Sequence, residues 1–132
     1  MAARWLTRAE RDLKSARVLL GTGPELLDNA AFHLQQAAER TLKAILAADG
    51  RRFRKIHKLG ELAGWVVERH PELAAHVEGL DPYTSWVGAG RYDDTDAEVP
   101  ITAETVTDLL HRCETLLAHA RCLAPSAEQP RD

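Results

Sequence analysis

The segment from Ala31 to Ala44 constrains the fold of this 132-residue chain more than any other. Its apolar residues recur every three or four positions, which is the spacing of one face of a helix. The stripe consists of Ala31, Leu34, Ala38, Leu42 and Ile45. Because alanine side chains leave room beside the backbone, the stripe predicts a long helix that a second helix can approach closely.

Glycines, prolines and a capping residue divide the rest of the chain into further helices. The expected helices cover residues 3–20, 25–48, 59–70, 72–78, a short stretch after residue 82, and 102–123. Thr102 is expected to be the N-cap of the last helix, after a loop over residues 88–100. The sequence predicts an all-α, antiparallel up-and-down bundle of four to five helices. One domain would occupy residues 1–124, followed by a disordered tail over residues 125–132.

Charge and cysteine content limit the classes of function. The net charge is −3, so the protein as a whole is not a basic nucleic-acid binder, and contact with RNA would need a local patch. Cys113 and Cys122 lie nine positions apart on one expected helix, too far along it to pair. Two reduced thiols indicate a cytoplasmic protein. Neither a membrane-spanning run nor a signal peptide is expected.

The expected second helix also carries a recognisable motif. The run Phe32-His33-x-Gln35-Gln36-Ala37-Ala38-Glu39-x-x-x-Lys43-Ala44 resembles the signature helix of the HEPN domains, small all-helical proteins of bacteria and archaea. Further matches follow the family's order over about residues 4–123, at Trp5, Asp12-Leu13, His57-Lys58-Leu59 and Arg91-Tyr92. The resemblance implies a helical bundle that forms a homodimer and needs no cofactor.

Glu39 and Lys43 in the motif have two interpretations. Their spacing of four makes a helix-stabilising ion pair, which contributes only about 0.3–0.5 kcal/mol when it is exposed. Alternatively, Arg91 in the Arg91-Tyr92 loop pairs with Glu39 in a partly buried contact. The Glu39 carboxylate would then contribute more to stability than an exposed pair does. His33, on the polar side of the same helix, is expected to lie at the surface or to cap.

The resemblance also implies a possible catalytic site. Many HEPN proteins are metal-independent ribonucleases, in which an arginine precedes a histidine by a few residues and two copies meet across a dimer interface. Histidine can move the proton of the RNA 2′-hydroxyl, and arginine can hold the phosphate. Chance matches are expected in a chain with so many arginines and histidines. Only the position of a match along the chain can therefore indicate a catalytic pair. The matches are Arg51 and Arg52 with His57, Arg69 with His76, and Arg112 with His119.

Arg112 and His119 alone lie in the region where the family places its catalytic pair. Seven residues of helix put both on one face, about 10 Å apart along the axis. Two features depart from the family pattern, because the tyrosine that often follows is missing and Arg112 is in the middle of a helix. The alternative is that both are polar residues on the outer face of an amphipathic helix.

A basic loop follows the expected second helix. Five cations and one aromatic ring lie close together there, at Arg51, Arg52, Arg54, Lys55, Lys58 and Phe53. The cations could contact phosphates and the ring could stack on a base, or the loop could simply be solvated. His57 belongs to the same stretch. The acidic residues over 93–98 lack the spacing of metal ligands, so no metal site is predicted.

Two functions from different classes are consistent with these residues. The first is the HEPN partner of a minimal nucleotidyltransferase in a toxin–antitoxin-like pair, with little or no catalysis of its own. The second is a metal-independent ribonuclease toxin with a composite Arg112–His119 site at the dimer interface. The departures at this pair favour the first. Either function could involve RNA or a nucleotide, with Glu39, Lys43, Tyr92 and the basic loop as candidate binding residues.

Overall fold

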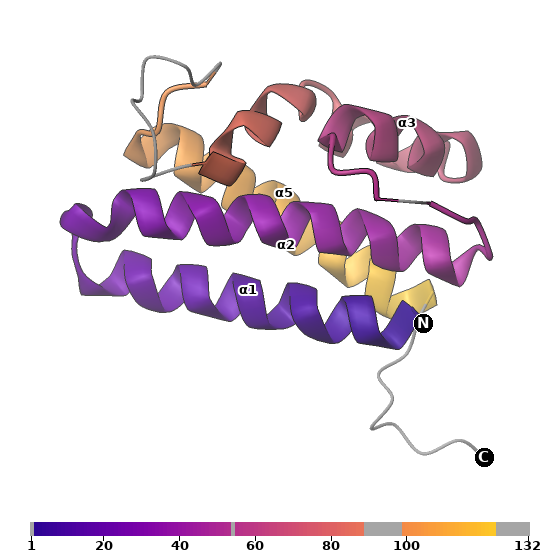
Figure 1. The fold of residues 1–132 in the computed structure, drawn as a ribbon, viewed down its shortest axis with the longest axis horizontal. Coiled ribbons are helices and arrows are strands. Elements are labelled where there is room, and N and C mark those ends of the chain that lie inside the picture. Colours follow the sequence, from indigo (N-terminus) through magenta and orange to yellow (C-terminus); the bar gives the residue numbers. More distant parts are fainter. Residues whose placement is uncertain (1, 54, 89–98, 124–132) are drawn as a thin grey trace.

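The computed structural model describes residues 2–53, 55–88 and 99–123 (Figure 1). These residues form helices, and no strand is present among them. The elements, with η for a 3-10 helix, are α1 (Ala2–Thr22), η1 (Pro24–Leu26), α2 (Leu27–Ala48), α3 (Leu59–Arg69), η2 (Pro71–Leu73), α4 (Ala74–Val77), η3 (Asp81–Gly88) and α5 (Ala103–Leu123). The prediction of an all-α helical bundle is confirmed.

The three long helices form the body of the bundle. α1 and α2 lie side by side as an antiparallel hairpin, and α5 crosses behind α2 (Figure 1). Arg17 pairs with Glu114 at 2.6 Å, and Glu10 pairs with Arg121 at 3.1 Å. Since residues early in α1 meet residues late in α5, these two helices are also antiparallel.

α2 is the centre of the core, as its stripe of small residues predicted. It packs against α1, α3, η3 and α5. Ala31 and Ala38 are completely buried, as are Leu34, Leu42 and Ile45. The methyl side chains let the neighbouring helices approach closely enough to bury even polar residues of α2. Any functional residue on this helix is therefore held on a rigid element.

Several predicted boundaries differ from the structure for local reasons. α2 begins at Leu27 rather than residue 25, because residues 24–26 form a 3-10 turn in which the Leu26 N–H donates to the Gly23 carbonyl. The helix expected over 72–78 divides into η2 and α4, since the Leu73 N–H likewise donates three residues back, to His70. The stretch after residue 82 is the 3-10 helix η3.

The start of α5 agrees with the predicted cap. Thr102 Oγ1 accepts a hydrogen bond from the Thr105 N–H at 3.1 Å, and Thr105 Oγ1 accepts one from the Thr102 N–H at 2.9 Å. Most of the expected 88–100 loop and the whole expected tail over 125–132 lie outside the described residues. No helix in the described part of the chain is both long and apolar enough to cross a membrane.

Candidate functional site

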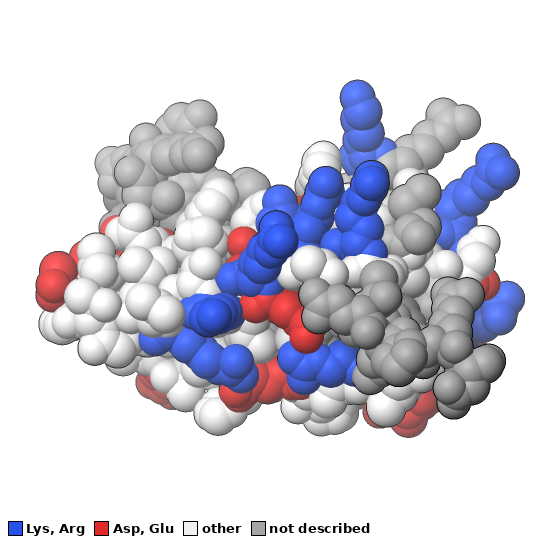
Figure 2. Space-filling model, turned by 90° about the horizontal axis from the view of Figure 1, so that it is seen from below, with Lys and Arg blue, Asp and Glu red and all other residues white. Residues whose placement is uncertain are grey.

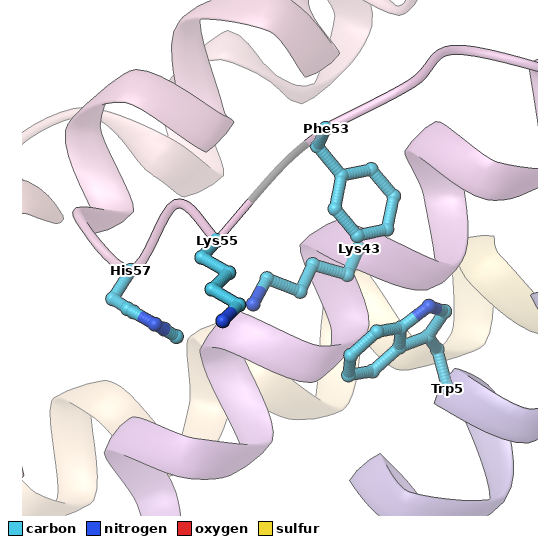
Figure 3. Close-up of a pocket in the computed structure, with 5 residues that line it drawn as sticks. All are labelled: Trp5, Lys43, Phe53, Lys55 and His57. Carbon is cyan, nitrogen blue, oxygen red and sulfur yellow. The ribbon is translucent and has the colours of Figure 1, made fainter.

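An open pocket of about 680 Å³ lies where α1, α2 and the α2–α3 connection meet (Figure 3). It combines two aromatic rings with three basic side chains. We call it the aromatic–basic pocket, and its lining residues are Trp5, Lys43, Phe53, Lys55 and His57. The Trp5 and Phe53 rings lie 5.8 Å apart between centroids and are tilted by 59°.

The antiparallel hairpin explains how these residues come together. It sets the first turn of α1, with Trp5, beside the second half of α2, with Lys43 (Figure 3). After α2 ends, the connection turns back toward α3, and its Phe53 and Ile56 pack against the core. These two apolar anchors position the intervening Lys55 at the pocket.

Lys43 forms the charged floor of the pocket. Its Nζ lies 2.8 Å from Glu39 Oε2, and 5.1 Å and 5.8 Å from the ring centroids of Trp5 and Phe53. The side chains of Lys43 and Glu39 are only 5% and 9% exposed. The interpretation of this pair as a solvated surface contact is therefore wrong. The ammonium is instead held by a buried carboxylate and by cation–π attraction.

Glu39 connects the floor of the pocket to its rim. The same Oε2 atom that receives Lys43 lies 3.0 Å from His57 Nδ1. The His57 side chain is 65% exposed, so its ring remains accessible while its position is set by Glu39. Arg91, the expected partner of Glu39, lies outside the described residues together with Tyr92.

The other basic residues of the connection do not line the pocket. The Arg51 guanidinium stacks 4.5 Å from the Trp65 ring centroid and pairs with Glu68 at 3.3 Å, so it faces α3. Arg52 is exposed, and Arg54 lies outside the described residues. The side chains of the basic loop therefore point to different places: Arg51 faces α3, Arg52 is exposed to solvent, and Lys55 lines the pocket.

Further cations surround the pocket along α1. Figure 2 shows lysine and arginine side chains gathered on the face formed by this helix. Those on α1 are exposed, and they are Arg4, Arg8, Arg11, Lys14 and Arg17. The Arg8 guanidinium lies 5.4 Å from the centroid of the Trp5 ring. A chain with a net charge of −3 therefore has a local basic surface.

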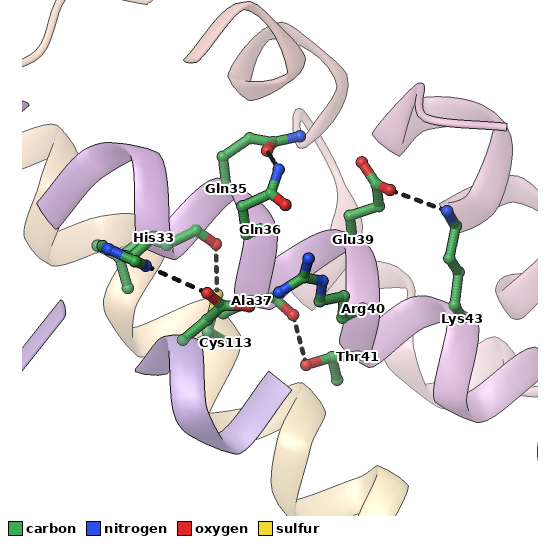
Figure 4. Close-up of polar contacts among 11 residues, drawn as sticks. His33, Gln35, Gln36, Ala37, Glu39, Arg40, Thr41, Lys43 and Cys113 are labelled. Carbon is green, nitrogen blue, oxygen red and sulfur yellow. Dashed lines mark hydrogen bonds and ion pairs between the residues drawn. The ribbon is translucent and has the colours of Figure 1, made fainter. Parts of the chain in front are cut away.

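Two other polar residues of the signature helix, His33 and Arg40, join α2 to α1 (Figure 4). Asp12, on α1, is 7% exposed and accepts a hydrogen bond from Arg40, while its other oxygen lies 3.1 Å from His33 Nδ1. His33 is thus half-buried and joins α2 to α1. The Gln36 amide donates to Gln35 Oε1 at 2.8 Å.

Arg112 is bound to the protein's own backbone. Its Nη1 donates to the carbonyls of Glu78 at 2.6 Å and His76 at 3.1 Å, and its Nε donates to Asp108 Oδ2 at 3.0 Å. The carbonyls at the end of a short helix such as α4 lack partners within the helix. Arg112, on α5, donates hydrogen bonds to these carbonyls and so fixes the α4–η3 corner.

Tyr83 completes this arrangement, because its hydroxyl donates to Asp108 at 2.7 Å. Burial, followed by the hydrogen bond to the Asp108 carboxylate, raises the pKa of Tyr83 to about 12. Asp108 therefore accepts hydrogen bonds from both Tyr83 and Arg112, and it ties η3 to α5.

His119 contacts a different set of residues. Its Nε2 lies 3.3 Å from His70 Nδ1, and the His70 Nε2 lies 2.8 Å from Asp49 Oδ2. His119 therefore meets the end of α3, whereas Arg112 meets α4. The contacts of the two side chains are with separate parts of the bundle.

Sequence analysis missed two residues of the aromatic–basic pocket. Trp5 entered only as a match to the family pattern, and Lys55 only as one of five loop cations that could contact phosphates, so nothing in the sequence placed the two side by side. The useful signal was the aromatic residue at the exposed start of α1, which the bundle cannot cover completely. Trp5 is accordingly half-buried.

These observations define a small helical-bundle protein with a basic, aromatic-lined pocket beside its central helix. The family model described as HEPN domain matches residues 2–123. The chain therefore belongs to the HEPN domain family, as its motifs indicated. Neither a curated protein nor a solved structure matches the chain significantly.

Proposed function

We propose that this protein is a non-catalytic HEPN partner that binds a nucleotide, or a nucleotide unit of RNA, in the aromatic–basic pocket. The observation that carries the proposal is the convergence of Lys55 and His57 with the Trp5 and Phe53 rings around an open space. The enzyme it serves would be a minimal nucleotidyltransferase, as the resemblance of a small stand-alone HEPN chain implies.

The chemistry of the pocket suits such a ligand. An aromatic ring stacks on any nucleobase, because every base has a π-face. Lys55 and the accessible His57 can donate hydrogen bonds to a phosphate, which are stronger when the donor or acceptor is charged. Glu39 balances the charge of Lys43 and so leaves the exposed cations to attract the anion.

The position of Arg112 supports a non-catalytic role. A phosphate held by the Nε and Nη1 donors of this guanidinium would have to displace the carbonyls of His76 and Glu78 and the carboxylate of Asp108. Losing these contacts would leave polar groups of the α4–η3 corner without partners, which costs free energy. A ribonuclease that held phosphate through the Nε and Nη1 donors of Arg112 would therefore have to rearrange the α4–η3 corner, even in a dimer.

A cleavage assay tests the absence of catalysis. The native protein is incubated with a mixed RNA pool in the presence of a metal chelator, beside the His119→Ala and His57→Ala variants. We expect no cleavage by any of the three. Cleavage by the native protein that disappears in His119→Ala and survives in His57→Ala would support the ribonuclease alternative instead.

A second assay tests the partner. The protein is co-expressed with a minimal nucleotidyltransferase encoded beside its gene, and the complex is isolated by size exclusion and its mass measured. We expect a complex that contains both chains, built on a HEPN homodimer. Failure of the two chains to associate, with the HEPN protein sedimenting as a monomer at micromolar concentration, would contradict both the pairing and the dimer.

A further inference from the structure

Three side chains that can ligate a metal meet where the α3–η2 junction approaches α5. His70 directly follows α3, Glu72 lies in η2, and His119 comes from the last turns of α5. The His70 Nδ1 and His119 Nε2 atoms are 3.3 Å apart, and Glu72 Oε2 lies 3.9 Å from each of them. All three potential ligand atoms lie within 4.8 Å of one another.

We propose that His70, Glu72 and His119 bind one zinc ion. Two imidazole nitrogens and one carboxylate are a ligand set that zinc accepts, with an open fourth position for water or another ligand. Zinc–nitrogen bonds of 2.0–2.1 Å in a tetrahedron place two ligand nitrogens about 3.3 Å apart. The His70–His119 separation already has this value.

Glu72 needs only a small adjustment to join the two histidines. Its oxygen must approach by roughly half an ångström to reach tetrahedral ligand separations. The Glu72 side chain is 60% exposed, so it can move without disturbing the core, whereas the histidine side chains are 12% and 24% exposed. The site thus has two positioned ligands and one that can close on the ion.

Asp49 gives an independent reason to assign a metal here. Its Oδ2 lies 2.8 Å from the other ring nitrogen of His70. A carboxylate that accepts this N–H fixes the tautomer with the lone pair on Nδ1, which is the nitrogen that faces His119. Metal-binding histidines usually have such a second partner, and it makes them stronger ligands. The Asp49 side chain is only 11% exposed, so the contact is held in place.

The site would connect three separate parts of the chain. Asp49 follows α2, His70 and Glu72 flank the α3–η2 junction, and His119 belongs to α5. Without an ion, the two histidines can share one hydrogen bond from His119 Nε2 to His70 Nδ1. An ion would replace that proton and bind the end of α5 to the corner after α3. This inference does not depend on the proposed function.

Zinc titration by calorimetry tests the site in a tag-free Cys122→Ser background. The substitution is needed because Cys122 is exposed, and a thiolate is itself a zinc ligand. We expect one zinc ion per chain. His119→Ala and Glu72→Gln should each weaken binding at least tenfold, and Asp49→Asn should weaken it by about 10–100-fold.

His111→Ala is the matched control. His111 lies on α5, is 72% exposed and has its own carboxylate neighbour, Glu114 at 3.3 Å, but it does not belong to the three-residue cluster. Its removal should leave zinc affinity unchanged. Because Glu72 is exposed, Glu72→Gln keeps the fold even if a histidine variant does not.

Cobalt(II) provides a second readout. Its visible d–d absorption strengthens in a tetrahedral site, and this signal should appear in the Cys122→Ser protein and disappear in Glu72→Gln. Absence of zinc binding, or equal affinity in Glu72→Gln and His111→Ala, would overturn the proposal and leave the two histidines joined by a hydrogen bond only.

Discussion

The two sets of charged residues that the sequence offered as functional sites are used in opposite ways. Around Glu39, Lys43 and His57, ion pairs place basic groups at the wall of an open pocket. Around Arg112, hydrogen bonds from Nε and Nη1 join α5 to the α4–η3 corner. Both regions contain a basic side chain paired with a carboxylate, but the His57 side chain is 65% exposed whereas that of Arg112 is 23% exposed.

The two regions differ in how far the protein itself already binds their basic groups. An arginine or histidine becomes a candidate for ligand binding only if its donors are not already satisfied by the protein. Arg112 has donors bound to two carbonyls and a carboxylate, whereas His57 is anchored by Glu39 through one nitrogen and remains mostly exposed. Substitutions in the two regions should therefore affect stability and binding differently.

Glu39→Ala should produce the largest loss of stability. It leaves the Lys43 ammonium buried without its carboxylate, and breaking a buried ion pair from one side costs about 3–5 kcal/mol. Chemical denaturation gives the free energy of unfolding of the variant and the native protein. A loss below the roughly 0.5 kcal/mol of an exposed pair would show that the contact is not buried in solution.

Double-mutant cycles identify what Glu39 pairs with. Glu39→Ala combined with Lys43→Met should cost less than the sum of the single changes, because the second change removes the stranded charge. The same cycle with Arg91→Ala tests the predicted contact between Glu39 and the 88–100 loop. Additive effects in that cycle would give Arg91 a different role, such as ligand or partner contact.

Arg112→Ala should also destabilise the protein, by about 1.5–3 kcal/mol, because it removes hydrogen bonds made by a charged group. The α4–η3 corner should respond first, which faster amide hydrogen exchange over residues 76–83 would report. A catalytic arginine held ready for substrate would behave differently. An Arg112→Ala variant as stable as the native protein would show that the hydrogen bonds of Arg112 do not stabilise the α4–η3 corner.

Tyr83→Phe should have a smaller effect of about 1 kcal/mol, since it removes one hydrogen bond to Asp108. The raised pKa of about 12 adds a pH signature. The protonated hydroxyl stabilises the fold fully below the ordinary pKa of 10.0, and this contribution is lost as the pH rises from there toward 12.

Alkaline titration of tyrosinate absorbance measures this difference. The chain has two tyrosines, so Tyr83 should ionise late and its late step should be missing in Tyr83→Phe. In unfolding experiments, the native protein should lose its advantage over Tyr83→Phe between pH 10 and 12. An unchanged difference over that range would mean that the pKa of Tyr83 is not raised by its burial and its hydrogen bond to Asp108.

Lys55→Ala should have the smallest effect on stability, within about 0.5 kcal/mol, because Lys55 is exposed at the pocket rim. Denaturation of this variant serves as the counterpart to Glu39→Ala. A large loss would mean that the rim of the pocket is structural, as the Arg112 region is.

Much of the fold could be predicted from local signals. The small-residue stripe of α2, the Thr102 cap and the helix-stopping glycines and prolines act within a few residues, so the sequence displays them directly. The 3-10 turns were missed because a hydrogen bond three residues back differs from one four residues back only in local geometry. Spacing along the sequence does not encode that difference.

The sites were harder to predict because they depend on contacts between distant segments. Glu39 and Lys43 could be paired from their spacing, but their burial depends on Trp5 and on the α2–α3 connection. Arg112 gave no sign that its partners would be the carbonyls of His76 and Glu78, more than thirty residues earlier. Every residue has a backbone carbonyl, so the residue types do not show which carbonyls will accept a hydrogen bond from a side chain.

We expect the aromatic–basic pocket, and not the Arg112 region, to bind the ligand. The most direct test is fluorescence anisotropy of a labelled single-stranded RNA oligonucleotide titrated with the native protein, Phe53→Ala and Arg112→Lys. Loss of one stacking ring costs about 1–3 kcal/mol, so Phe53→Ala should weaken binding by about tenfold or more. Arg112→Lys should leave the affinity unchanged. Weaker binding by Arg112→Lys with unchanged binding by Phe53→Ala would contradict the account.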